Sequence, residues 1–149
     1  MAIRHFRGEY AFLSNFAESM IVVDGLIWGT VEHAFQAAKM LDEANKERIR
    51  GAPYPRLAKY LGRTLSPRRT DWEQCKEDIM HQMVTLKFKQ NEHLLAKLLS
   101  TGTEELVEGN NWHDNIWGDC ECPECQNIPG QNLLGKVIMR VRSELTPNQ

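Results

Sequence analysis

The chain of 149 residues lacks several features that would assign it to a common class at once. No stretch approaches the roughly eighteen consecutive apolar residues of a transmembrane helix, so we expect no membrane span. The N-terminal residues 1–6 have no apolar core of a signal peptide. Glycine-rich loops of the Walker or dinucleotide-binding type are absent. The formal net charge is only −2, so the whole molecule is not a polycation that binds polyanions.

Cysteine is scarce and unevenly placed. Three of the four cysteines, Cys120, Cys122 and Cys125, lie close together, which is a poor disulfide framework and is typical of a protein in the reducing cytoplasm. Thiolates at this spacing can hold zinc, but a structural site needs a fourth ligand: His113, Cys75 or a carboxylate. Because no second Cys-x-x-Cys pair exists, the alternative is a loop of free thiols. We predict no cofactor and no bound metal.

Length and composition indicate one soluble globular domain over residues 1–149. The Asp24–Gly25 pair between two apolar runs predicts a β-hairpin, because a type I′ turn needs positive φ. Thr30 predicts the N-cap of a helix that runs to about Glu43. Apolar periodicity predicts further helices over residues 56–61, ending at Gly62, and over about 72–90. Another is expected from a cap at Asn91 to Gly102, and a last one opens at Asn132 or a near neighbour and buries apolar residues up to Leu145. With a short strand near 105–108, the fold class is α+β, mostly α, with a small antiparallel sheet or hairpin.

Residues 31–39 combine a polar row with an apolar stripe. Glu32, Gln36 and Lys39 share one helix face, because positions i, i+4 and i+7 lie above one another. The stripe beside them consists of Ala34, Phe35, Ala38 and Leu41. Such a row is either part of a functional site or a solvated face with a Glu32–Lys39 surface pair.

Three irregular segments gather side chains that a fold alone does not demand. Asn15 could offer an amide to a ligand, and Phe16 could offer a ring face for stacking. The alternative is a turn in which the Asn15 side chain bonds to its own backbone. Residues 110–119 hold two tryptophans, two aspartates and three asparagines. Indole rings stack on bases or sugars and carboxylates bind ribose hydroxyls, whereas a loop pinned by one buried tryptophan is the competing interpretation. A basic run is either a phosphate-binding group or a solvated surface; it comprises Arg56, Lys59, Arg63, Arg68 and Arg69.

Together these segments form an ordered set of motifs that covers nearly the whole chain. In order they are Phe12-Leu13-Ser14-Asn15-Phe16, Glu32-His33-x-Phe35-Gln36-x-x-Lys39, Gly62-Arg63, Asp71-Trp72-Glu73-x-x-Lys76, Trp117-Gly118-Asp119, and Asn132-x-Leu134-Gly135-Lys136-x-x-Met139-x-x-Arg142. The set resembles the NADAR (YbiA-like) family. The insert Cys120–Cys125 departs from the shorter Gly-rich loop of the YbiA-type members.

The resemblance implies an N-glycosidase that cleaves the bond between ribose C1′ and a nucleobase nitrogen, on a compact and mainly helical α+β domain. The expected substrate is ADP-ribosylated guanine, in a nucleoside or in DNA or RNA. The alternatives are a glycosidase of phosphoribosyl intermediates of riboflavin synthesis and a non-catalytic module that binds ADP-ribose. No membrane partner is expected.

The same resemblance assigns roles to individual side chains. Glu32 is the expected acid/base or charge stabiliser; a raised pKa would require burial or a neighbouring carboxylate, for which Asp119 and Asp114 are the candidates. Lys39 is the candidate nucleophile of an alternative route through a Schiff base with ring-opened ribose. The residues expected to bind the ligand are Asn15, Phe16, Gln36, Arg63, Trp72, Trp117 and Gly118.

Overall fold

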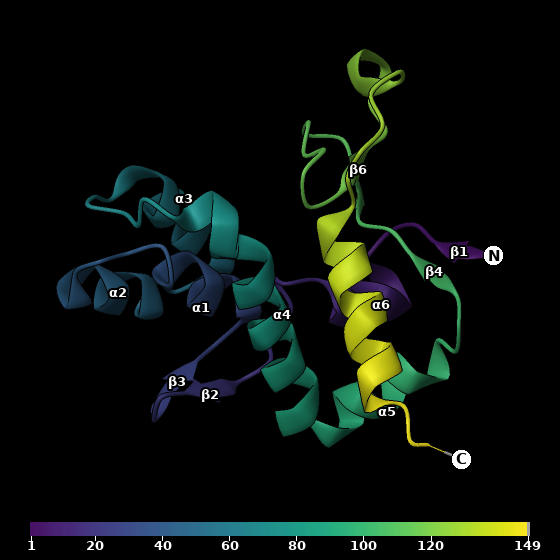
Figure 1. Ribbon diagram of the computed structural model, residues 1–149, viewed down its shortest axis with the longest axis horizontal. Coiled ribbons are helices and arrows are strands. Elements are labelled where there is room, and N and C mark those ends of the chain that lie inside the picture. Colours follow the sequence, from purple (N-terminus) through teal and green to yellow (C-terminus); the bar gives the residue numbers. More distant parts are fainter. Residues whose placement is uncertain (149) are drawn as a thin grey trace. The chain divides into compact units, whose positions relative to one another are not determined.

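A computed structural model describes residues 1–148 and has the expected α+β architecture, dominated by helices (Figure 1). The chain packs as two compact units. The central unit comprises Asn15–Glu92, and the terminal unit combines Met1–Ser14 with the described part of His93–Gln149. The expectation that residues 1–149 form one domain stays a prediction. No helix in the described range is long and apolar enough to cross a membrane.

The central unit begins with the predicted hairpin. Strands β2 (Ile21–Val23) and β3 (Leu26–Trp28) pair in antiparallel register, with Ile21 opposite Trp28. Asp24 and Gly25 both have positive φ, 51° and 82°, as the predicted turn requires. Four helices follow: α1 (Val31–Ala37), α2 (Glu43–Arg50), α3 (Pro55–Thr64) and α4 (Trp72–Gln90). Helix α1 packs against α2, α3 and α4.

Helix α1 is shorter than predicted. Thr30 caps it as expected, because its hydroxyl accepts the backbone N–H of His33 at 3.1 Å. The predicted extension to Glu43 is wrong, since the backbone after Ala37 pairs with a later segment: the N–H of Arg69 donates to the carbonyl of Lys39 at 2.8 Å. Asp42 then caps the separate helix α2, which the sequence analysis missed. Leu41, assigned to the apolar stripe, is 59% exposed.

Helices α3 and α4 correct one prediction and confirm another. Gly62 was expected to end a helix, but it lies buried within α3, which continues to Thr64. Helix α4 has the predicted bounds. Asp71 stands at its N-cap without a side-chain cap bond, because both carboxylate oxygens accept from Arg69 at 2.9 and 3.0 Å.

The terminal unit contains the short strands and the last two α-helices. Its elements are β1 (Ala2–Ile3), the 3-10 helix η1 (Gly8–Leu13), α5 (Glu92–Ser100), β4 (Glu105–Leu106), β5 (Gly109–Asn110), β6 (Asp119–Cys120), the 3-10 helix η2 (Pro123–Cys125) and α6 (Leu133–Leu145). Strand β1 pairs with β4, and β5 with β6. Both pairs are parallel, so β2 and β3 form the antiparallel pair among the described strands, and an isolated antiparallel bridge joins Met40 to Arg68.

Asn132 begins α6 as predicted but does not cap it with its side chain. Its backbone is left-handed, with φ of 51°. The amide instead holds the segment after β4: it donates to the carbonyl of Leu106 at 2.9 Å and accepts the N–H of Glu108 at 3.0 Å. The side chain therefore joins the start of α6 to the neighbouring strand.

Candidate active site

The polar row of α1 lies in the interior of the central unit. Every residue of the helix is buried, and Glu32 and Gln36 are only 7% and 4% exposed. Gln36 Nε2 donates to Glu32 Oε2 at 2.5 Å. The interpretation of this row as a solvated surface face is therefore wrong for Glu32 and Gln36.

Burial sets the acidity of Glu32. Removal from water raises the pKa of the carboxyl above its ordinary value, although the Gln36 hydrogen bond and the charges of Lys59 and Lys39 oppose the rise. No carboxylate contributes to this shift. The second carboxylate expected from Asp119 or Asp114 is thus not needed to raise the pKa of Glu32.

Gln36 is fixed by a glycine on the neighbouring helix. A Cβ atom at Gly62 of α3 would lie 2.0 Å from Gln36 Oε1 and 3.0 Å from Gln36 Cβ. Gly62 therefore creates the space in which the amide lies beside Glu32. Gln36 Oε1 is buried without a hydrogen-bond partner, which is unfavourable in a packed interior and common where a ligand supplies the missing donor.

Lys39 follows the end of α1 and lies against two aromatic rings. Its Nζ is 5.6 Å from the centroid of the Trp72 ring and 6.0 Å from that of Phe35. Partial burial lowers the pKa of the amine; Glu32 opposes this, while Arg68, Arg63 and Lys59 lower it further. Such surroundings increase the fraction of neutral, nucleophilic amine.

Asn15 is buried at the start of the same helix. Its backbone carbonyl accepts the N–H of Glu32 at 3.1 Å, and its Nδ2 donates to Met80 Sδ at 3.4 Å. Asn15 Oδ1 is a second buried oxygen without a hydrogen-bond partner. The alternative of a turn closed by the Asn15 side chain finds no support in these contacts. Phe16, 40% exposed, has Lys59 Nζ 6.0 Å from its ring centroid.

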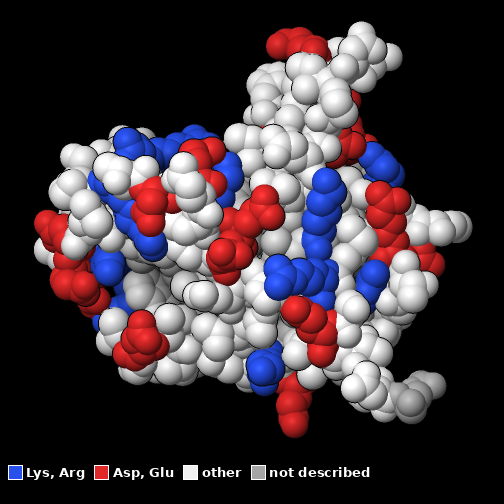
Figure 2. Space-filling model, viewed as in Figure 1, with Lys and Arg blue, Asp and Glu red and all other residues white. Residues whose placement is uncertain are grey.

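Part of the predicted basic run surrounds Lys39. Lys59 and Arg63 lie on α3, and they act with Arg68 on the pKa of Lys39. Figure 2 shows Lys and Arg side chains gathered over the part of the central unit where Figure 1 places α3. Arg69 is less suited to bind a phosphate, because Asp71 occupies its guanidinium.

His33 has a structural role that the sequence analysis did not assign. Its Nε2 lies 2.9 Å from the carbonyl of Ala52, and its Nδ1 lies 2.8 Å from Thr30 Oγ1. A carbonyl only accepts, so Nε2 carries the proton and Nδ1 accepts from the hydroxyl. The ring joins α1 to the segment before α3 and leaves no nitrogen for catalysis.

The remaining predicted site residues belong to the terminal unit. Asp114 Oδ1 accepts the N–H groups of Ile116 and Trp117 at 3.0 and 2.9 Å, so this carboxylate closes a turn. Asp119 pairs with Arg4 at 3.2 Å and accepts the N–H of Gly130 at 3.1 Å. Gly118 is buried where a Cβ would lie 2.3 Å from the Glu108 carbonyl. Trp117 is half-buried in the same loop. The contacts of Asp114 and Asp119 therefore hold the backbone of this loop in place.

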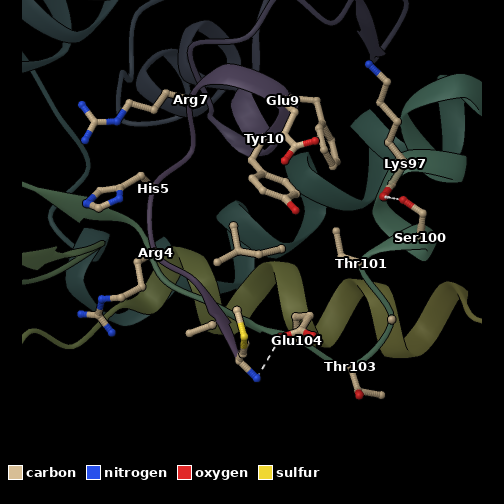
Figure 3. Close-up of a pocket in the computed structure, with 15 residues that line it drawn as sticks. Arg4, His5, Arg7, Glu9, Tyr10, Lys97, Ser100, Thr101, Thr103 and Glu104 are labelled. Atoms are coloured by element: carbon tan, nitrogen blue, oxygen red, sulfur yellow. Dashed lines mark hydrogen bonds and ion pairs between the residues drawn. The ribbon is translucent and has the colours of Figure 1, made fainter.

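The terminal unit also contains an open pocket that none of the predicted site residues lines (Figure 3). Arg4, His5 and Arg7 lie on one wall, and Glu104 pairs with the N-terminal amine of Met1 at 3.2 Å. All the residues that line this pocket belong to the terminal unit, whereas Glu32 and the residues around it belong to the central unit.

Comparison with known proteins places the chain in a family. The model of the NADAR domain matches residues 4–146. The chain belongs to the NADAR family. It is 42% identical to "N-glycosidase YbiA" of Shigella boydii, over 92% of this chain and 82% of that protein. The NMR structure of Escherichia coli YbiA superposes with a TM-score of 0.83 at 38% identity, over 97% of this chain and 83% of that one. A "Riboflavin biosynthesis protein" of Vibrio vulnificus is 36% identical over 92% of this chain and 36% of its own length.

Within this NADAR chain, the motifs of the sequence divide into two groups. Glu32, Gln36 and Lys39 cluster in the central unit, with Asn15 beside Glu32 and Trp72 beside Lys39. Others maintain the scaffold: Arg142, for example, donates to Thr101 Oγ1 at 2.9 Å and to the carbonyl of Glu104 at 2.8 Å. Gly62 was the residue whose role was missed. The signal available in the sequence was a glycine within a helical pattern, directly before the basic Arg63. Such a glycine indicates close packing at its position.

Proposed function

We propose that this chain removes ADP-ribose from ADP-ribosylated guanine by cleaving the bond between ribose C1′ and the base nitrogen. It is an N-glycosidase of the NADAR family, as its 42% identity to N-glycosidase YbiA indicates. The family gives the type of reaction, and the choice of ADP-ribosylated guanine as the substrate is the part that we propose.

One observation carries the assignment of the site. The buried carboxyl of Glu32, whose pKa is raised, lies beside the buried amide of Gln36, and it is close enough to the partly buried amine of Lys39 for the charges of the carboxylate and the ammonium to interact. Cleavage of a C1′–N bond requires a proton for a poor leaving group and stabilisation of positive charge at C1′. Glu32 supplies the proton when neutral and the stabilising charge when ionised. The unpartnered oxygens of Gln36 and Asn15 accept hydrogen bonds from ribose hydroxyls.

Lys39 gives the reaction a covalent route. Glu32 protonates the ring oxygen O4′ as the C1′–O4′ bond breaks, which leaves a C1′=N iminium to the base, and the neutral amine of Lys39 adds to C1′. The C1′–N bond to the base breaks, and the base leaves with a proton. Water then hydrolyses the Lys39 imine and releases the sugar aldehyde and the free amine. Lys59, Arg63 and Arg68 are the cations that bind the phosphates of the substrate.

The covalent route is tested by adding borohydride during turnover. We expect a reduced protein–sugar adduct that mass mapping assigns to Lys39. Lys46→Arg changes an amine of α2 that pairs with exposed Glu43 and should still give the adduct, whereas Lys39→Arg should not. If no adduct forms, or if it maps to another residue, cleavage is by direct hydrolysis and the Lys39 step is wrong.

The substrate assignment is tested with one panel of compounds. The wild-type chain is assayed on ADP-ribosylated guanosine, on its DNA-linked form and on phosphoribosyl pyrimidine intermediates of riboflavin synthesis. We expect release of ADP-ribose from the first two with kcat/KM well above the third. The reverse order supports the riboflavin alternative, which the named Vibrio relative favours. Binding of ADP-ribose by calorimetry without any turnover on the panel indicates a non-catalytic module.

A further inference from the structure

A cluster of three cysteines and one histidine lies in the terminal unit, outside the candidate active site of the central unit. One ligand atom from each of His113, Cys120, Cys122 and Cys125 lies within 4.8 Å of all the others. We propose that these four side chains bind one structural zinc ion. This replaces the expectation of a loop of free thiols without metal.

Two separations within the cluster are close to those of a tetrahedral site, and all the others are within 4.8 Å. With Zn–S bonds of about 2.3 Å and Zn–N bonds of about 2.0–2.1 Å, a nitrogen and a sulfur ligand are about 3.6 Å apart. His113 Nδ1 lies 3.4 Å from Sγ of Cys122 and 3.4 Å from Sγ of Cys125. Two sulfur ligands of zinc are about 3.8 Å apart. Small side-chain rotations therefore bring all four atoms onto one metal.

The backbone brings each ligand to the cluster. Cys120 ends strand β6, and the 3-10 turn η2 returns the chain so that the N–H of Cys125 donates to the carbonyl of Cys122 at 3.1 Å. The residues beside His113 are held by Asn110, whose Oδ1 accepts the N–H groups of Trp112 and Asp114 at 3.2 and 3.1 Å. In Figure 1 this loop, coloured from green to yellow-green, extends from β6.

His113 occupies a costly backbone conformation that directs it to the sulfurs. Its φ is 69°, in the left-handed region that is unfavourable for a residue with a side chain. Such conformations persist where the surroundings or a ligand compensate for them. A metal bond to Nδ1 supplies that compensation.

Hydrogen-bond donors lie beside two of the sulfurs. The N–H of His113 donates to Cys120 Sγ at 3.3 Å, and Asn115 Nδ2 donates to Cys125 Sγ at 3.4 Å. Glu124 Oε2 lies 4.0 Å from Nε2 of His113, the ring nitrogen that a metal on Nδ1 leaves free. Donors to thiolate sulfur and a carboxylate near the second imidazole nitrogen are typical surroundings of protein zinc sites.

Four protein ligands leave no coordination position for water or substrate, so the site is structural. Its effect is to fix the loop that carries Trp117, Gly118 and Asp119. Asn115 connects the cluster to this loop. Its Oδ1 accepts the N–H of Cys120 at 2.9 Å, and its backbone carbonyl accepts the N–H of Gln131 at 2.8 Å. Cys75 belongs to the central unit and is outside the cluster, which makes it the matched control.

The first test is the metal content of the full chain, purified without an affinity tag or chelator and analysed by elemental mass spectrometry. We expect about one zinc per chain in the wild type and in Cys75→Ser, and almost none in Cys125→Ser. His113→Ala should bind zinc more weakly, whereas His93→Ala should retain it. Wild-type protein with less than about a tenth of an equivalent, or zinc that persists in Cys125→Ser, overturns the proposal.

The second test needs no variant and decides the matter if Cys125→Ser fails to fold. The wild-type chain is stripped of metal and titrated with Co²⁺. We expect the intense visible absorption of tetrahedral cobalt with a thiolate charge-transfer band, saturating at about one equivalent and abolished by added Zn²⁺. A weak octahedral spectrum without the charge-transfer band contradicts the assignment.

Discussion

Two opposing effects act on the carboxyl of Glu32. Its place in the first turn of α1 favours the anion, because the helix N-terminus is the positive end of the dipole. Burial favours the neutral acid and is the larger effect, so the pKa is raised. A residue buried in this way lowers the stability of the protein at neutral pH, and that cost is expected where function requires the group.

This cost gives a pH-dependent prediction for stability. The raised pKa means that the folded chain binds this proton more tightly than the unfolded chain, so the contribution of Glu32 to stability falls as the pH rises above about 4.5. Glu32→Gln removes the charge and should be more stable than the wild type at about pH 7.5, with the difference disappearing at about pH 4. Urea unfolding at both pH values measures it. Glu43→Gln, in the first turn of the exposed helix α2, should show no such pattern; a wild type that is more stable than Glu32→Gln at neutral pH contradicts the raised pKa.

Gly62 provides a second test of the residues around Glu32. Alanine within a helix normally stabilises it by up to about 1 kcal/mol relative to glycine. Gly62→Ala should instead destabilise the chain by about 1–3 kcal/mol and lower kcat/KM, because the new methyl group displaces the buried Gln36 amide. The measurements are urea unfolding and steady-state kinetics. Gly29→Ala is the control, because its Cβ would meet no atom within 4 Å. A Gly62→Ala variant with increased stability and full activity would show that Gln36 is free to move.

Among the elements, α1 depends most on its first turn. The Thr30 hydroxyl accepts the N–H of His33 and bonds to its imidazole, which in turn bonds to Ala52. Thr30→Ala should reduce the free energy of unfolding by about 1–2 kcal/mol and lower activity, because both the cap and the orientation of the ring are lost. Thr30→Ser retains the hydroxyl and should recover most of the stability. Equal losses in the two variants would mean that the methyl group, rather than the hydroxyl, is the important part.

The sequence predicted elements where the signal is local. The hairpin turn at Asp24–Gly25, the Thr30 cap and the full extent of α4 follow from turn chemistry, capping and apolar periodicity. The end of α1 did not, because it is set by pairing with a segment about thirty residues later, which no local pattern encodes.

The same distinction applies to the site. The spacing of Glu32, Gln36 and Lys39 predicted that they share a face, and the family resemblance implied that the face has a function. Neither predicted that the row is buried, that Gly62 makes room for Gln36, or that His113 rather than Cys75 joins the three clustered cysteines. These facts arise from packing between distant segments, which the spacing within one segment does not reveal.

At the scale of the whole molecule, charge limits how the chain binds nucleic acid. The net charge is −2, and three of the cations, Lys59, Arg63 and Arg68, act on Lys39 beside the site. About three phosphate contacts to a single strand predict a slope near −2 for log kcat/KM against log salt on the DNA-linked substrate. Assays from low to moderate salt measure this slope. Arg63→Gln should make it shallower by roughly one unit. A slope steeper than about −5 would require an extended nucleic-acid surface that this account does not contain.

The central claim is that the buried Glu32 carboxyl performs the proton and charge work of C1′–N cleavage. The most direct measurement is single-turnover release of ADP-ribose from ADP-ribosylated guanosine by Glu32→Gln, with Glu43→Gln as the matched control and circular dichroism to verify folding. We expect the rate to fall by about 10²–10⁴-fold in Glu32→Gln, because general acid–base catalysis contributes that much, and to be unchanged in Glu43→Gln. A folded Glu32→Gln variant with a rate close to that of the wild type would contradict the account.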